Sequence, residues 1–426
     1  KNMSEQIKSV RGMRDILPEE IEVWQSVEAI IFKTLESFGF EEIRLPIVED
    51  LRLFQRSVGS YTDIVQKEMY VFQDKAGRHL ALRPEATASV VRAYLEHQIY
   101  LKKKITRLYY SGPMFRYDRP QKDRYRQFYQ IGAEIFGGSS PYFDVEMIII
   151  LSKIFNLIGI SEYLFEINSV GCNICKIKYE TKLKEFLELN KDQMCQDCKL
   201  RMQHNVLRVL DCKLDTCRKI IRNAPTIENF LCNDCIKHQE AVYTVLDKRH
   251  INYEKNQYLV RGLDYYTKIV FELKIKNEEN SVAGGGRYDN LVKELGGPVT
   301  PAVGFAIGMD RLCSILNGDL CIKNKILIVF LDKQSIEAGM PIIDNSRISG
   351  IRISADYSER SLKSHLKNAD RENINNVLIL GENELEKKCF LYKNMRDGSQ
   401  KYIKFDELSN FFKELKNVKD SHMRTD

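Results

Sequence analysis

Residues 128–135 constrain the fold of this chain more than any other stretch, because their side chains alternate between two kinds. The apolar set comprises Tyr129, Ile131, Ala133 and Ile135. The other set comprises Phe128, Gln130, Gly132 and Glu134. Successive side chains of a strand point to opposite faces of its sheet, so the apolar set predicts a core face. The second set lacks the Lys and Thr of a solvated strand, and it favours a ligand-binding face over an ordinary polar one.

Other periodic patterns predict the elements around this strand. Helical spacing of apolar residues predicts a helix over residues 21–38 that ends at Gly39. A strand over residues 42–48 follows, and Pro46 within it indicates an edge strand, either a dimer surface or a solvent edge. Residues 107–136 are expected to form two strands joined by a polar loop. Further β-like stretches at 259–273, 281–286 and 302–307 precede an expected helix at 309–316.

A second domain is predicted in the C-terminal part of the chain. After a polar join at 317–324, residues 326–331 and 377–380 are continuous apolar runs of the kind found in buried strands. Residues 360–369 between them indicate a helix. We therefore expect a first domain at 1–320, a small α/β domain at 325–418 and a polar tail at 419–426, which suits a chain of 426 residues.

The composition narrows the class of protein. Hydrophobic residues make up 43% of the chain, as in proteins that bury real cores. No run of about 18 apolar residues occurs, and the first residues contain no apolar signal segment. We therefore expect a cytoplasmic protein that has no membrane partner. The net charge of +6 is compatible with nucleic-acid binding but does not indicate it by itself.

Cysteines are concentrated in one part of the chain. Eight of the eleven form three C-x-x-C pairs and two further positions, namely Cys172, Cys175, Cys195, Cys198, Cys212, Cys217, Cys232 and Cys235. In a reducing compartment such pairs favour a structural metal over disulfides. Eight thiols suffice for two four-cysteine Zn²⁺ sites or for one site with spares, and reduced thiols are the alternative. We expect at least one structural Zn²⁺ in a charged helical module at about 172–250, with the pairing left open.

Four segments combine charged residues with aromatic residues or glycines. The loop 116–126 holds five cationic residues, and arginine binds phosphate in a bidentate manner. Arg261 and Asp264 interrupt a β-forming aromatic run. Glycines 284–286 allow a ligand to approach the backbone, and Arg311 lies near a helix N-terminus, where anions are favoured. Each segment alone also fits an ordinary turn, ion pair or surface arginine. The phosphate-loop pattern G-x-x-x-x-G-K-[ST] does not occur.

In this order, the four segments resemble motifs 2 and 3 of class II aminoacyl-tRNA synthetases and the two histidine-specific signatures of histidyl-tRNA synthetases. The segment with Pro46 is similar to motif 1, the dimer element of that class, and residues 83–87 are similar to its R-P-E-x-T segment. The most specific matches are Arg-Gly-Leu-Asp-Tyr-Tyr at 261–266 and Gly-Gly-Gly-Arg-Tyr-Asp at 284–289. The resemblance covers nearly the whole chain. It implies an α+β catalytic domain built on an antiparallel sheet, with a helical insertion and a C-terminal α/β anticodon-binding domain.

The resemblance also implies a function. A histidine–tRNA ligase forms histidyl-adenylate and pyrophosphate from histidine and ATP with Mg²⁺, and then transfers histidine to the 3′-terminal adenosine of its tRNA. A homodimer is implied as well. ATP is assigned to Arg116, Asp118, Arg124, Phe128 and Arg311. Histidine is assigned to Glu85, Thr87, Gln130, Glu134, Arg261, Tyr266 and Tyr288. The acceptor end of tRNA is assigned to Arg119 and Gln121.

Individual roles follow from the same resemblance. Arg116 and Arg261 are expected at the α-phosphate, because a carboxylate attacking a phosphate brings two anions together and cations must screen them. Arg124 and Arg311 are expected at the γ-phosphate and Phe128 against adenine. Glu85, Thr87 and Gln130 are expected at the α-amino group of histidine, and Glu134 and Tyr266 at its imidazole. The family usually has Glu where Asp118 stands and Gly where Ala86 stands.

The regulatory subunit of ATP phosphoribosyltransferase shares the catalytic fold and is the alternative. That family lacks the anticodon domain and parts of the catalytic set, whereas Arg116, Arg261 and Arg311 are all present here. A generic nucleic-acid-binding module is a second alternative, but it would not need the glycine-rich segment or the segment at 261–266.

Overall fold

The computed structural model describes residues 7–59, 62, 64–119, 123–278, 280–316, 325–348, 351–358 and 360–420, with backbone alone for 416–420. Gln121, the join at 317–324 and residues 421–426 of the expected tail lie outside these ranges. The chain forms two compact units, Lys1–Leu320 and Cys321–Asp426.

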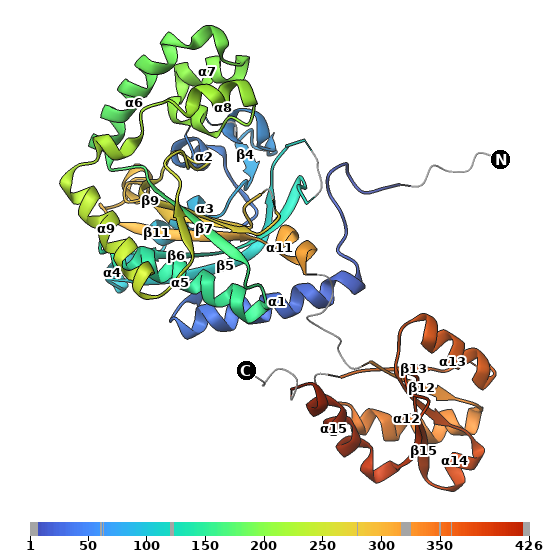
Figure 1. The fold of residues 1–426 in the computed structure, drawn as a ribbon. Coiled ribbons are helices and arrows are strands. Elements are labelled where there is room, and N and C mark those ends of the chain that lie inside the picture. Colours follow the sequence, from blue (N-terminus) through green and yellow to red (C-terminus); the bar gives the residue numbers. More distant parts are fainter. Residues whose placement is uncertain are drawn as a thin grey trace, which may run out of the picture. The chain divides into compact units, whose positions relative to one another are not determined.

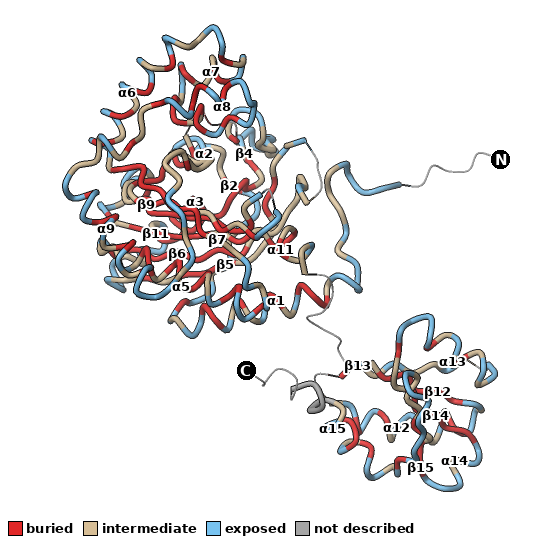
Figure 2. Tube along the Cα trace, in the orientation of Figure 1, coloured by how far each residue is buried: buried red, intermediate tan, exposed pale blue. Residues whose placement is uncertain are grey.

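An eight-stranded, mostly antiparallel sheet is the centre of the first unit (Figure 1). Its strands, in spatial order, are β1 (Glu41–Glu42), β5 (Thr106–Phe115), β6 (Gln127–Phe136), β11 (Ala302–Gly308), β10 (Ala283–Arg287), β9 (Thr267–Ile275), β7 (Tyr163–Ser169) and β8 (Tyr253–Lys255). Only the two edge pairings, β1 with β5 and β7 with β8, are parallel within this sheet. Buried residues concentrate in the middle strands (Figure 2).

Helices cover both faces of this sheet. The larger core packs one face against α1 (Pro18–Ser37), α5 (Pro141–Ile158), α9 (Asn233–Lys248) and α11 (Met309–Ile315). The opposite face packs against α3 (Thr87–Glu96), α4 (Ile99–Lys102) and α10 (Leu291–Glu294). Next to α3 lie α2 (Leu51–Ser57), a π-helix at Ile64–Glu68 and a small sheet of β2 (Val48–Asp50), β4 (His79–Leu82) and β3 (Val71–Gln73).

The alternation predicted for residues 128–135 is confirmed on β6. Ile131, Ala133 and Ile135 are fully buried in the core beneath α1 and α5. Glu134 faces the opposite side, where Thr87 at the start of α3 contacts it. The predicted pair of strands is a hairpin of β5 and β6, and the predicted first helix is α1, which begins at Pro18.

The strand predicted over residues 42–48 is wrong as a single strand. Ile43 still donates its N–H to the carbonyl of Tyr109 on β5, at 2.8 Å, but the chain then leaves that sheet. The next strand, β2, begins at Val48 and belongs to the small sheet. Pro46 lies between the two strands, and it has no N–H with which to continue the first ladder.

The β-like stretch predicted from residue 259 also begins too early. Residues 259–266 are irregular, and β9 starts at Thr267. Polar contacts with other segments hold this stretch, including an Asn205 Nδ2 bond to Asp264 Oδ1 at 2.5 Å. We call residues 259–266 the Arg261 loop.

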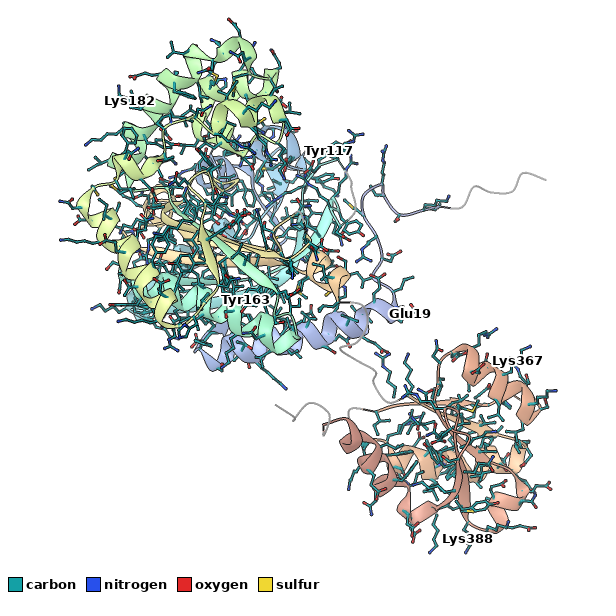
Figure 3. All side chains as sticks on the ribbon, viewed as in Figure 1. Glu19, Tyr117, Tyr163, Lys182, Lys367 and Lys388 are labelled. Carbon is teal, nitrogen blue, oxygen red and sulfur yellow. The ribbon has the colours of Figure 1, made fainter. Side chains whose placement is uncertain are left out.

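The cysteine-rich region forms the expected helical module, with a hydrophobic core of its own. Its helices are α6 (Asn173–Leu189), Lys191–Gln193, α7 (Gln196–His204), Val206–Asp211, α8 (Asp215–Ile221) and Ile227–Phe230. The module is narrower than the predicted 172–250, because Val242, Tyr243 and Leu246 of α9 pack into the main core of the first unit. Charged side chains such as Lys182 on α6 point into solvent (Figure 3).

The second unit is the predicted α/β domain. Its five-stranded sheet has the order β13 (Arg352–Asp356), β12 (Lys325–Phe330), β14 (Asn376–Leu380), β15 (Cys389–Asn394) and β16 (Gln400–Lys404). The first three strands are parallel and the last two antiparallel. Its helices are α12 (Lys333–Ser346), α13 (Leu362–Arg371), α14 (Glu382–Glu386) and α15 (Leu408–Asp420). Among the described residues, none of the helices combines the length and apolar character needed to cross a lipid bilayer.

Candidate active site

A cavity of about 310 Å³ lies over β6, β10 and β11. It brings together all five residues predicted to bind ATP and two of those predicted to bind histidine. Its wall includes Arg116, Asp118, Arg124, Phe128, Gln130, Arg261 and Arg311. Four arginines from segments far apart in the sequence therefore line one cavity, and their charges favour a polyanionic ligand.

Arg116 is held at the end of β5. Its Nε donates to the carbonyl oxygen of Pro84 at 2.9 Å, and its guanidinium lies 5.2 Å from the centre of the Phe128 ring. Desolvation lowers the pKa of Arg116 from its usual value, with carboxylates such as Glu68 opposing the shift. The ring of Phe128 therefore lies in the cavity wall beside the cation of Arg116. A flat, anionic ligand could stack on the ring and pair with the cation.

Two further arginines, Arg124 and Arg311, line the same cavity. Arg124 forms an ion pair with Asp118, and Arg311 donates to the carbonyl oxygen of Ser281. Desolvation lowers the pKa of Arg311, and the charge of Arg124 lowers it further. An anion bound between these two guanidinium groups, such as a terminal phosphate, would relieve their electrostatic repulsion. Arg119 is exposed on the same loop.

Arg261 points from its loop toward β9 and β10. It is paired with Glu272 of β9, and this carboxylate raises its pKa against the effect of desolvation. A Cβ placed on Gly284 would lie 2.5 Å from Arg261 Nη1. The guanidinium therefore needs a glycine at that position of β10, which explains one of the three glycines that the sequence singled out.

Glu134 lies on the same face of β6 as Phe128 and Gln130 of the cavity wall, and it is only 1% exposed. We call Glu134 and the side chains that contact it the Glu134 cluster. Thr87 Oγ1 donates to Glu134 Oε1 at 3.0 Å, and the hydroxyl of Tyr288 donates to Oε2 at 2.5 Å. Burial raises the pKa of Glu134 to about 8, although both hydroxyls oppose the shift. Gly304, opposite Glu134 on β11, leaves room for the carboxylate, because a Cβ there would lie 1.6 Å from Oε2.

Glu85 is a second buried carboxylate, and it caps α3. It accepts hydrogen bonds from the backbone N–H groups of Thr87 and Ala88 at 2.7 and 2.9 Å. Burial raises its pKa, although these donors favour the charged form, and its charge helps to raise the pKa of Glu134. Glu85 and Glu134 thus make this end of the site the natural place for a cationic or N–H-donating group.

Aromatic side chains surround the Glu134 cluster. The ring of Tyr265 contacts Tyr266 in a tilted arrangement, with centres 4.7 Å apart, and Tyr288 edge-on, with centres 5.5 Å apart. Tyr110 of β5 lies opposite Gly132 of β6, and a Cβ at that glycine would meet its hydroxyl oxygen at 2.2 Å. Sequence reasoning missed Tyr110 and Tyr265; for Tyr110 the signal was Gly132, which only the strand register links to it.

Arg287, in the middle of the glycine-rich segment, is structural. It is fully buried and donates from Nε to Asp144 Oδ1 of α5 at 3.1 Å. Its Nη1 donates to the carbonyl oxygen of Gly138 at 2.7 Å, and His238 also contacts Asp144. The ion pair between Arg287 and Asp144 joins β10 to α5, and it thereby holds Tyr288, the next residue, in the Glu134 cluster.

The eight clustered cysteines separate into two groups. Within each group the four sulfur atoms all lie within 4.8 Å of one another. One group is Cys172, Cys175, Cys232 and Cys235. The other is Cys195, Cys198, Cys212 and Cys217. The sequence left this pairing open.

The antiparallel sheet carries a cavity that is lined by arginines and has no phosphate loop. Together with the separate α/β unit, this architecture is that of a class II aminoacyl-tRNA synthetase. The family model described as histidyl-tRNA synthetase matches residues 12–312, and that described as anticodon binding domain matches 326–415. This chain belongs to the histidyl-tRNA synthetase family.

Known relatives agree with this assignment. A protein of Thermodesulfovibrio yellowstonii named histidine–tRNA ligase is 47% identical over 404 residues, which is 94% of this chain and 96% of the relative. The structure of apo histidyl-tRNA synthetase from S. aureus is 34% identical with a TM-score of 0.77, covering 96% of this chain and all of that one. A Bacillus halodurans structure named ATP phosphoribosyltransferase regulatory subunit/histidyl-tRNA synthetase has 20% identity and a TM-score of 0.63, over 88% of this chain and 98% of that one. It shows the shared fold alone.

Proposed function

We propose that this chain is a histidine–tRNA ligase, which activates histidine with ATP and transfers it to the 3′-terminal adenosine of its tRNA. One observation carries the proposal: the buried carboxylate of Glu134 lies on the same face of β6 as Phe128 and Gln130, which line the cavity with four arginines. An amino acid held at Glu134 would meet a nucleotide held in that cavity.

The nucleotide is assigned to the arginine-lined cavity. Arg116 would hold the α-phosphate, where it can neutralise charge that develops as the carboxylate attacks. Arg124 and Arg311 would share the γ-phosphate, and the ring of Phe128 would stack on adenine, with Asp118 near its amino group. Mg²⁺ enters with ATP as part of the substrate. The mutual repulsion of Arg124 and Arg311 supports this assignment.

Histidine is assigned to the Glu134 cluster. Its neutral imidazole carries an N–H that Glu134 can accept, with Tyr266 and Tyr288 beside the ring. Its α-amino group would lie near Glu85, Thr87 and Gln130. Arg261, in the wall of the arginine-lined cavity, would bridge the carboxylate and the α-phosphate. Thr87 and Tyr288 each occupy one lone pair of Glu134, and a ligand without the imidazole donor would leave the remaining acceptor capacity of this buried carboxylate unused, which provides discrimination.

The remaining partners follow from the reaction. The second unit, which matches the anticodon-binding family, would bind the anticodon end of tRNA, and Arg119 and Gln121 its acceptor end. We propose a cytoplasmic homodimer that associates along the segment from β1 to β2, where Ile47 and Val48 are 40% and 41% exposed. Light scattering on the purified chain tests the dimer: a mass near 49.7 kDa instead of twice that value would refute it.

The cysteine-rich module is proposed to hold at least one structural Zn²⁺. Both four-cysteine groups have the ligand number and type of a closed structural site. Zinc there would stabilise the fold of the module and would not react.

ATP–pyrophosphate exchange with each of the twenty amino acids tests the function. Exchange with histidine alone is expected, and Arg261→Ala should reduce it more than a hundredfold because the bridging cation is lost. Exchange with another amino acid would overturn the role of Glu134. A folded chain without any exchange would favour the regulatory subunit of ATP phosphoribosyltransferase.

A further inference from the structure

The sulfur positions of the two cysteine groups match the geometry of a tetrahedral metal site. Cys172 Sγ lies 3.5 Å from Cys175 Sγ and 4.0 Å from Cys232 Sγ, and Cys175 lies 3.9 Å from Cys235. In the other group, Cys195 and Cys212 are 3.9 Å apart. The edge of a tetrahedron whose centre is about 2.3 Å from each sulfur measures roughly 3.8 Å.

Backbone N–H groups point at sulfur in both groups. In the first group, the N–H of Cys232 donates to Cys175 Sγ at 3.1 Å. In the second, the N–H of Cys198 donates to Cys195 Sγ at 3.4 Å and that of Cys195 to Cys217 Sγ at 3.3 Å. Such donors stabilise thiolates, which are the species that bind zinc.

The first group lies where the chain enters and leaves the module. Cys172 and Cys175 stand at the start of α6, directly after β7, and Cys232 and Cys235 stand at the start of α9. A metal at this point joins the two connections and closes a loop of about 60 residues, which restricts the unfolded chain much as a disulfide does.

The second group lies inside the module and brackets the segment that touches the active site. Cys195 and Cys198 begin α7, and Cys212 and Cys217 follow the segment. Between the two pairs, Asn205 donates to Asp264 at 2.5 Å and Arg208 Nη1 donates to the carbonyl oxygen of Arg261 at 3.3 Å. These two contacts connect the module to both ends of the 261–264 stretch of the Arg261 loop.

Lys213, directly after Cys212, lies in the wall of the arginine-lined cavity. It is a fifth cation beside Arg116, Arg124, Arg261 and Arg311. Like charges repel, so a flexible segment would turn Lys213 away from the cavity. Bonding of the neighbouring Cys212 to a metal would hold the backbone of Lys213 in place.

We propose that each cysteine group binds one Zn²⁺ and that the second ion positions Lys213 and the Arg261 loop for ATP. The first ion fastens the module to the catalytic unit. The effect on ATP rests on the proposed function, whereas the two metal sites do not.

Elemental analysis of the full chain, expressed with zinc and purified under reducing conditions, tests the sites. Two zinc ions per chain are expected for the wild type. Cys232→Ser and Cys212→Ser should each retain one, and Cys389→Ser, a matched change of a buried cysteine in the second unit, should retain two. Fewer than two in the wild type, or two in Cys212→Ser, would overturn the assignment. Should a variant fail to fold, titration of the native wild type with a mercurial thiol reagent should still release two ions.

Hydrogen exchange tests the coupling without requiring activity. Cys212→Ser should accelerate exchange in residues 205–213 and in 259–266 by about tenfold or more, while α5 exchanges as in the wild type. Unchanged exchange of residues 259–266 would refute the coupling.

Exchange kinetics test the role of Lys213. Lys213→Ala should raise the KM for ATP about fivefold with the KM for histidine unchanged, and Lys219→Ala, an exposed lysine of the same module, should leave both unchanged. An unchanged KM for ATP in Lys213→Ala would refute the positioning role. Zinc-replete wild type that shows no histidine-dependent exchange would instead refute the proposed function, and the zinc count would stand.

Discussion

Replacement of Glu134 by glutamine separates the two properties of this carboxylate, its charge and its acceptor oxygens. Glutamine keeps the shape but has one acceptor oxygen, while Thr87 and Tyr288 already donate to the two oxygens of Glu134. Above pH 8, where the carboxyl of Glu134 is ionised, the imidazole of histidine would therefore lose a charged partner. A hydrogen bond to a charged group contributes about 1.5–3 kcal/mol, and each 1.4 kcal/mol is about tenfold. We expect kcat/KM for histidine to fall between about 10-fold and about 150-fold.

Histidine-dependent ATP–pyrophosphate exchange measures this effect. Glu146→Gln is the matched control, because Glu146 is a partly exposed carboxylate of α5 paired with Arg107 at 2.9 Å, a contact worth at most about 1 kcal/mol. The KM for ATP should remain unchanged in both variants. A Glu134→Gln enzyme that activates histidine within twofold of wild type would refute the assignment of the imidazole to Glu134.

The pH dependence of the free energy of unfolding provides an independent test of the raised pKa of Glu134. Burial raises the pKa of Glu134 from 4.5 to about 8, so the folded protein keeps a proton that the unfolded chain has released. The wild type should therefore lose stability relative to Glu134→Gln as pH rises from about 4.5 to about 8. At about 1.4 kcal/mol per unit the difference reaches on the order of 5 kcal/mol. Denaturant unfolding at several pH values measures it, and a difference that stays constant with pH would show that Glu134 ionises normally.

Three further changes test the surroundings of the site. Asp144→Asn should destabilise the protein by about 3 kcal/mol, measured by denaturant unfolding, because it removes the fully buried counter-charge of Arg287 and leaves only the partly exposed Asp289 paired with it; a loss below 1 kcal/mol would contradict this. Gly304→Ala should reduce kcat/KM for histidine at least tenfold in exchange assays, since its methyl group would displace Glu134, and equal activity would refute the close packing. Arg116→Lys should raise the KM for ATP about tenfold, because lysine cannot make a bidentate phosphate contact, while the KM for histidine serves as the internal control.

Local patterns predicted most elements because they depend on short-range geometry. The period of two in residues 128–135 identified both faces of β6, and helical spacing identified α1. The same reasoning failed where a tertiary contact outweighed local preference. Pro46 moved the chain from one sheet to another, and the contacts of Asp264 and Arg261 with the module kept residues 259–266 out of β9.

The sequence alone determined the chemistry available to this protein: its arginines, the carboxylate of Glu134 on a strand and its eight clustered cysteines. The motifs that resemble the synthetase family are short and contiguous, so no folding is needed to read them. Only the tertiary structure decided which residues meet, because strand register and loop contacts join positions far apart in the chain. It brought Gly304 to Glu134, Gly284 to Arg261 and Lys213 to the arginine-lined cavity, and it sorted eight cysteines into two groups of four.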